Sequence, residues 1–203
     1  MSQTEFIQNE IEHARFNGYL QDNTAEILNE YLVDDLQLWI SEREGKIPIE
    51  VLYLPRPASD YPGCYPLHFE KHLPRLLETD NYVHFFGGKA KTGYRIDIKP
   101  ELKPDMVCNV EYLGIEDNQF NGGMADPPYD ERFAKELYNC EYPQWSKWTH
   151  ELVRIVKPNG LIGIMNNYPV PRLKGCQWEK IVILLLRIKQ FPKVITIQRK
   201  ESQ

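Results

Sequence analysis

The sequence NGGMADPPYDER, residues 121–132, combines a short apolar run with two consecutive prolines between an aspartate and a tyrosine. Proline fixes φ and lacks a backbone N–H, so Asp126-Pro127-Pro128-Tyr129 cannot lie inside a strand or a helix. The residues before it, GGMA, are typical of the end of a buried strand. The sequence therefore predicts a stiff, extended tetrapeptide at a strand end, which presents one carboxylate and one aromatic ring.

Short apolar segments surround this tetrapeptide from residue 82 onward. Strands that are apolar at nearly every position indicate a sheet covered on both faces, and helices between them are typical of an α/β fold with a mostly parallel sheet. We predict about seven strands, with the last of them inserted antiparallel near one edge. Their sequences are YVHFF, YRIDI, DMVCNV, GGMAD, GLIGIM, KIVILLL and KVITIQ. In such sheets ligands bind at the carboxyl ends of the strands.

Four strand ends carry groups that suit a ligand. Gly87 and Gly88 follow YVHFF and would let a ligand approach the backbone. Asp97 follows YRI, where nucleotide-binding folds place an acid on a ribose diol, and Asn109 could pair with an adenine edge. Asp126 is the fourth. Singly, the glycines could form a turn, and Asp97 and Asn109 could be a solvated strand end and a turn former. In order along one sheet, they predict a binding site.

The segment from about Tyr65 to Lys200 resembles the class I S-adenosylmethionine-dependent methyltransferases, in particular those that methylate exocyclic amino groups, such as DNA adenine-N6 methyltransferases. HFFGG resembles their glycine-rich cofactor loop, and YRIDI carries the ribose-binding acid. PDMVCNVEYLGIEDNQFNGGMADPPY resembles the run from the adenine-contacting strand to the catalytic tetrapeptide. CYPLHFEKHLPRLL resembles the segment that completes the methionine pocket, and HELVRIVKPNGLIGI matches the helix, turn and strand that follow.

The resemblance implies a Rossmann-like fold, S-adenosyl-L-methionine as cofactor, and two sets of site residues. The catalytic residues would be Asp126, Pro127, Pro128 and Tyr129. The cofactor-binding residues would be Tyr65, Pro66, Phe86, Gly87, Gly88, Asp97, Ile98, Asn109, Val110 and Asp126. Asp126 and the Pro127 carbonyl would accept both N–H bonds of the amine, while Tyr129 would stack on a base turned out of its helix.

The chain departs from the family pattern in three ways. Only KAKT and Gly93 separate Gly88 from YRIDI, whereas a crossover between parallel neighbours normally needs about ten residues or more. We therefore expect the first crossover helix to be missing, with a tight loop in its place; the alternative is that YVHFF pairs differently. Asn109 and Asn121 stand where aspartates are usual. The last strands use most of the residues after Tyr129, which leaves no room for a separate target-recognition domain.

Apolar residues at helical spacing predict a helical N-terminal extension, residues 1–48, and the resemblance implies a methyltransferase domain, residues 49–203. The polar, acidic start predicts no signal peptide, and no apolar run approaches the roughly 20 residues that span a membrane. His68 and His72 lack further ligands, so we expect no metal site. Four scattered cysteines indicate reduced thiols in a cytoplasmic protein. They are Cys64, Cys108, Cys140 and Cys176.

Charge is distributed unevenly along the chain, whose net charge is −5. Residues 1–45 carry ten acids against two bases, and residues 171–203 carry eight bases against two acids. The acidic helices suit a homodimer contact or a partner subunit, and the basic end could contact nucleic acid. The candidate bases are Arg172, Lys174, Arg187, Lys189, Lys193, Arg199 and Lys200.

The favoured activity is methyl transfer to adenine N6, with DNA favoured over RNA as the partner. Methylation of amino groups in RNA, or of glutamine amides in protein, are the alternatives within the enzyme class, because such enzymes employ similar tetrapeptides. From a different class, the chain could be a catalytically weak binding subunit that needs a partner chain. The absent recognition domain and the shortened cofactor loop would suit that role.

Overall fold

The structure is a computed structural model that describes residues 47–55, 64–136, 138–186 and 192–202. Its strands are β1 (Ile49–Leu54), β2 (Tyr82–Phe85), β3 (Tyr94–Asp97), β4 (Met106–Val107), β5 (Phe120–Ala125), β6 (Val156–Asn166), β7 (Cys176–Leu186) and β8 (Lys193–Lys200). Its helices are α4 (Leu73–Leu76), α5 (Glu131–Glu136) and α6 (Trp145–Ile155), with the 3₁₀ turns η2 (Phe69–Lys71) and η3 (Pro100–Leu102). None of these helices has the length and apolarity that a bilayer span requires.

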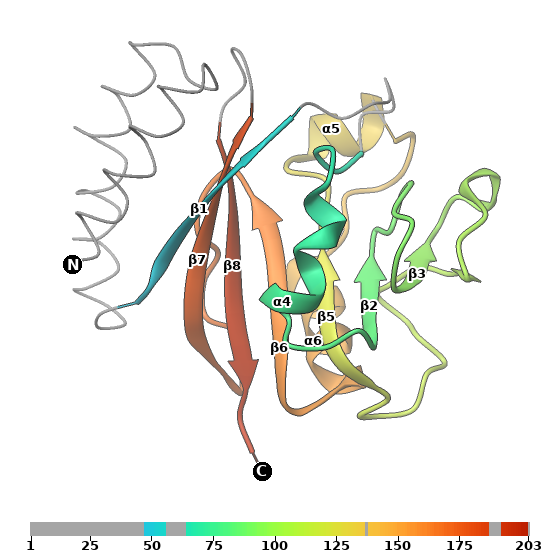
Figure 1. The fold of residues 1–203 in the computed structure, drawn as a ribbon. Helices are drawn as coiled ribbons and strands as arrows, with labels where there is room; N and C mark the ends of the chain where they lie inside the picture. Colours follow the sequence, from blue (N-terminus) through green and yellow to red (C-terminus); the bar gives the residue numbers. More distant parts are fainter. Residues whose placement is uncertain (1–46, 56–63, 137, 187–191, 203) are drawn as a thin grey trace.

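The predicted α/β fold with a mostly parallel sheet is confirmed. The strands form one sheet in the order β1-β7-β8-β6-β5-β2-β3-β4 (Figure 1). As predicted, β8 runs antiparallel to both of its neighbours, β6 and β7. The sheet has eight strands, one more than the seven expected, because β1 pairs in parallel with β7. It thereby satisfies backbone groups that β7 would expose as an edge strand.

The N-terminal extension expected over residues 1–48 lies almost entirely outside the described residues, which begin at residue 47. Its helical character and its role in a dimer or partner contact therefore stay predictions.

Both faces of the sheet are covered by helices, as the apolar strands predicted. Figure 1 shows α4 in front of the sheet and α6 behind it. On the α6 face, Trp148 and Leu152 are buried, and a Cβ added to Gly123 would lie 2.7 Å from Leu152 Cδ1. On the α4 face, Leu77 and Met124 belong to one buried apolar cluster. The missing side chain of Gly123 thus lets α6 pack directly on β5.

The first crossover of the sheet contains no helix, and side chains hold its loop in place. Residues 86–93 connect β2 to the parallel strand β3 without a helix, which confirms the expected loss. The next two connections contain only the turn η3, a loss that the sequence pattern did not indicate. Glu70 Oε1 accepts two backbone N–H groups of the first loop, and Asp97 Oδ2 accepts the N–H of Gly88. The carboxylates of Glu70 and Asp97 therefore hold this loop in place, where a crossover helix would otherwise lie.

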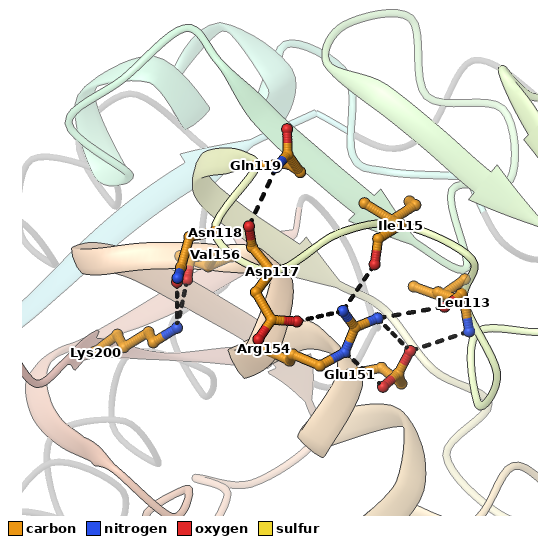
Figure 2. A network of polar contacts seen from close by, with 9 residues as sticks. All are labelled: Leu113, Ile115, Asp117, Asn118, Gln119, Glu151, Arg154, Val156 and Lys200. Atoms are coloured by element: carbon orange, nitrogen blue, oxygen red, sulfur yellow. Dashed lines mark hydrogen bonds and ion pairs between the residues drawn. The ribbon is translucent and has the colours of Figure 1, made fainter. Parts of the chain in front are cut away.

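The long loop between β4 and β5 is fastened to α6 by a polar network (Figure 2). The guanidinium of Arg154 donates to the carbonyl oxygens of Leu113 and Ile115 at 3.3 and 2.7 Å. It also pairs with Asp117 and Glu151 at 2.7 and 2.8 Å. Glu151 in turn accepts the N–H of Leu113 at 3.0 Å. Because Arg154 and Glu151 are mostly buried, salt screens their pairing less than that of a surface pair.

Gly93 closes the first crossover in the left-handed conformation, with φ at 70°. A Cβ added there would lie 2.5 Å from Tyr82 Cε2, in addition to the strain of a positive φ. We expect Gly93→Ala to lower the free energy of unfolding by about 1–3 kcal/mol, measured by urea denaturation. Gly114→Ala is the control, because a Cβ there meets nothing within 4 Å. Equal losses for both variants would show that the crossover is not constrained at Gly93.

Candidate active site

A cavity of about 600 Å³ at the carboxyl edge of the parallel strands brings several predicted site residues together. Those on its wall are Phe86, Asp97, Ile98, Asn109, Val110 and Pro128. A smaller hollow of about 50 Å³ shares Asp97 and Pro128 with it and adds Gly88 and Asp126. Concave sites of this combined size are typical of small-molecule and cofactor binding.

Asp97 organises the wall of this cavity. Its side chain is buried, and both oxygens accept backbone N–H groups, Oδ2 from Gly88 at 2.8 Å and Oδ1 from Lys99 at 2.9 Å. Gly88 has a left-handed φ of 50°, which glycine adopts without a steric penalty. A carboxylate can accept about four hydrogen bonds, so Asp97 retains acceptor capacity for a ligand hydroxyl.

The other predicted cofactor residues, Gly87, Tyr65 and Pro66, are not among the described residues that line either hollow. A Cβ added to Gly87 would lie 3.0 Å from the Cβ of Arg95, so the small size of Gly87 serves packing against β3. The Tyr65 hydroxyl lies 3.2 Å from Nδ1 of His84. The carbonyl of Pro66 accepts the first N–H of η2. The structure thus does not bring these three onto the wall of either hollow.

Tyr65 and His84 form an uncharged polar pair near the tetrapeptide. Burial lowers the pKa of His84 to about 4, so the imidazole is neutral at pH 7. Burial also raises the pKa of the Tyr65 phenol, and the negative charge of Asp126 raises it further. Both pKa shifts keep the pair neutral. Tyr65 lies close enough to Asp126 for the carboxylate charge to raise the pKa of its phenol.

Residues 138–144 also line the cavity, and sequence reasoning missed them. The segment has neither strand nor helix periodicity, so its pattern gave no reason to assign it to a site. Acids outnumber bases on the completed wall, which favours a ligand that carries positive charge. The charged lining residues are Asp97, Glu101, Glu111 and Glu141 against Lys99.

The tetrapeptide extends from the end of β5, as predicted, and Pro127 and Pro128 are buried. The Tyr129 hydroxyl donates to Asp126 Oδ1 at 2.9 Å. Burial raises the pKa of the Asp126 carboxyl to about 6, although the hydrogen bond from Tyr129 and the charge of Lys193 lower it. Asp126 is therefore an ionised acceptor at pH 7 and becomes protonated in mild acid.

Lys193 lies at the tetrapeptide, whereas sequence reasoning grouped it with the basic surface. Its Nζ lies 3.7 Å from the centroid of the Tyr129 ring and donates to Asn167 Oδ1 at 3.1 Å. Burial lowers the pKa of Lys193, and the charge of Asp126 opposes this shift. Because β8 is antiparallel, its first residue lies at the carboxyl edge of the other strands. The antiparallel direction predicted for this strand could have indicated that Lys193 lies at this edge.

Within the described part of the chain, no cluster of His, Cys, Asp and Glu side chains could hold a metal ion. His68 takes a left-handed φ of 69° before η2, and His72 follows that turn. The two histidines are therefore not on consecutive turns of one helix. All four cysteines are free thiols.

No protein-family model and no curated protein matches the sequence. Solved structures do match it. One is a chain from the complex between the Trm112 methyltransferase activator of Haloferax volcanii and a protein classed as a methyltransferase, with a TM-score of 0.50 and 12% identity over 67% of this chain and 90% of that one. The fold is that of class I methyltransferases.

Two further solved structures match the chain with lower TM-scores. TrmN from Thermus thermophilus matches with a TM-score of 0.49 and 12% identity, over 69% of this chain and 51% of that one. The N-methyltransferase NodS from Bradyrhizobium japonicum WM9 matches with a TM-score of 0.44 and 11% identity, over 66% and 96%. At these identities the similarity concerns the fold.

The ionised form of Asp126 destabilises the folded protein. Its folded pKa of about 6 exceeds the roughly 3.9 of an unfolded aspartate, so stability falls as the pH rises through that interval. Asp126→Asn removes the buried charge and keeps an acceptor for Tyr129. We expect a higher melting temperature than that of the parent at pH 8 and little difference at pH 4, measured by thermal unfolding. A lower melting temperature at pH 8 would contradict the buried charge.

Proposed function

We propose that the protein is an S-adenosyl-L-methionine-dependent methyltransferase that acts on an exocyclic amino group of a nucleobase, with adenine N6 in DNA as the first candidate. The observation that carries this proposal is the position of the tetrapeptide between two cavities. Pro128 lines the cavity of about 600 Å³ whose wall carries more acids than bases, which we call the acidic cavity. Both Pro127 and Pro128 line a second cavity of about 310 Å³. A cofactor and an acceptor in these two cavities would meet at the tetrapeptide.

The acidic cavity fits the proposed cofactor by its size and its polar groups. Asp97 has acceptor capacity for ribose hydroxyls, and Asn109 and Val110 offer an amide and an apolar side chain to an adenine ring. The excess of acids on the wall suits a positively charged sulfonium. When bound, S-adenosylmethionine supplies an activated methyl group on that sulfonium.

The tetrapeptide makes the acceptor nitrogen a better nucleophile. An exocyclic amine is a weak nucleophile, because its lone pair is delocalised into the ring. Asp126 and the Pro127 carbonyl accept its two N–H bonds and draw the nitrogen toward tetrahedral geometry, which frees the lone pair. The prolines hold both acceptors in place, so no ordering cost arises during the reaction. The aminium product loses its proton readily to water, and a separate general base is not required.

A partner chain and a reducing compartment are parts of the same proposal. The Haloferax volcanii protein with this fold was solved together with an activator, which supports assays with and without a partner subunit. Free cysteines support a cytoplasmic location. RNA and protein amides present similar acceptor nitrogens, so a labelled-methyl transfer assay should compare DNA, RNA and protein pools.

Removal of the Asp126 carboxylate should separate catalysis from cofactor binding. We expect Asp126→Ala to lower turnover roughly 100-fold or more, because the acceptor nitrogen loses its alignment. Binding of S-adenosylhomocysteine, measured by calorimetry, should stay measurable, since Asp97 and the rest of the acidic wall remain. Asp80→Ala is the control, because Asp80 is exposed before β2, at the opposite end of the strand. Turnover equal to the parent's in Asp126→Ala would reject the proposed role.

The Tyr129 hydroxyl should affect the pH dependence, and its ring should affect substrate binding. Because the hydroxyl lowers the pKa of Asp126, Tyr129→Phe should keep turnover at pH 8 but move the acid limb of the pH–rate profile to higher pH. Tyr129→Ala removes a stacking surface worth about 1–3 kcal/mol and should weaken oligonucleotide binding roughly 5- to 150-fold. If Tyr129→Ala methylates its substrate as well as the parent does, the ring only packs, and the acceptor is not a base.

A further inference from the structure

The second cavity beside the tetrapeptide is aromatic. Tyr142, Trp145 and Tyr168 line it and are 46%, 38% and 59% exposed, respectively. Among the residues that the structure describes, no charged side chain lines this cavity. Exposed rings above the apolar wall of Pro127 and Pro128 form a surface on which flat, π-rich groups can stack.

A third cavity, of about 770 Å³, continues from the second one. The two share Trp145, and the consecutive residues Pro171 and Arg172 line one each. In a chain of net charge −5, the excess of bases on this third wall favours an anionic ligand. Its charged residues are Arg154, Arg172, Lys174 and Lys200 against Asp117 and Glu201. We call the second and third cavities together the aromatic–basic groove.

Two of these bases act mainly inside the protein. Arg154 holds the loop before β5, and Lys200 Nζ donates to Asn118 Oδ1 at 2.9 Å and to a backbone carbonyl at 2.6 Å (Figure 2). Arg172 and Lys174 are exposed. The outer end of the groove therefore has these two exposed side chains on its wall.

The basic C-terminal surface expected from the sequence is not one surface. Arg199 forms ion pairs with two glutamates, Lys193 lies at the tetrapeptide, and Lys200 is buried. Arg187 and Lys189 lie outside the described residues. The two described members of that set that are exposed both line the aromatic–basic groove.

We propose that the aromatic–basic groove binds a single-stranded segment of nucleic acid, with unpaired bases next to the target stacked on Trp145 and Tyr168 and phosphates near Arg172 and Lys174. This inference rests on the proposed function and specifies its substrate. Single strands expose base faces that a duplex keeps stacked, and grooves for them combine aromatic rings with bases that follow the backbone.

Fluorescence anisotropy with a short labelled DNA oligonucleotide, as a single strand and as a duplex, tests this binding mode. The parent should bind the single strand more tightly. Trp145→Ala and Tyr168→Ala should each weaken that binding roughly 5- to 150-fold. Lys174→Gln should reduce the slope of log affinity against log salt by about 0.7. Tyr112→Ala and Lys71→Gln are the matched controls, because both residues are exposed and line neither cavity.

The outcomes distinguish the groove from the proposed function. If Tyr168→Ala binds the single strand as tightly as the parent does, the proposed binding in the groove is wrong. The side chain of Tyr168 is too exposed to be needed for folding, so this variant should fold. Tighter binding of the duplex than of the single strand would also contradict the proposal. If the oligonucleotide is nevertheless methylated, the proposed function stands without the groove. If the parent binds the single strand but shows no calorimetric binding of S-adenosylhomocysteine, the methyltransferase proposal fails instead.

Discussion

The carboxylate of Asp97 accepts the backbone N–H groups of Gly88 and Lys99, and the shape of the carboxyl edge of the parallel strands depends on these two bonds. Parallel strands are usually joined through helices, which satisfy their own backbone groups. The loops after β2 and β3 contain no α-helix, so their N–H groups need side-chain acceptors. Asp97 lies at the end of β3, between the two loops, and fixes both. An acid that suits a ribose is thus also the residue that shapes its own cavity.

Helix α6, the longer of the two helices that the structure describes between β5 and β6, contributes residues that hold the loop before β5 and residues that line the aromatic–basic groove. In its last turn, Arg154 holds the loop that leads away from the acidic cavity. Its first residue, Trp145, lines the aromatic–basic groove. Acids line the cavity that shares Pro128 with the groove, and bases line the far end of the groove, so a cation and an anion are drawn to different parts of the site.

Most strands and the acids at their ends could be predicted from the sequence, because most strands are buried apolar runs, Asp97 ends β3 and Asp126 follows β5. Trp145 could not be assigned in this way. It lies on the same helical stripe as Trp148, so periodicity predicts burial for both, yet Trp148 is buried and Trp145 stands 38% exposed at the first position of α6. The position of Lys193 could be predicted only from the direction of its strand, because composition groups it with the other bases. The cavity wall at residues 138–144 is irregular, and only the folded chain shows where it lies.

The position of Lys193 restricts how a base can use the tetrapeptide. Its ammonium lies 3.7 Å from the centroid of the Tyr129 ring and so covers one face of that ring. A cation–π contact of this kind is worth about 0.5–2 kcal/mol, similar to the roughly 1–3 kcal/mol of base stacking. A base that displaced Lys193 would lose much of what it gained, and the ammonium would also lose its attraction to Asp126. Under the proposed function, a base stacked on the opposite face would keep both interactions, so Lys193 would select the side of Tyr129 from which the acceptor base approaches.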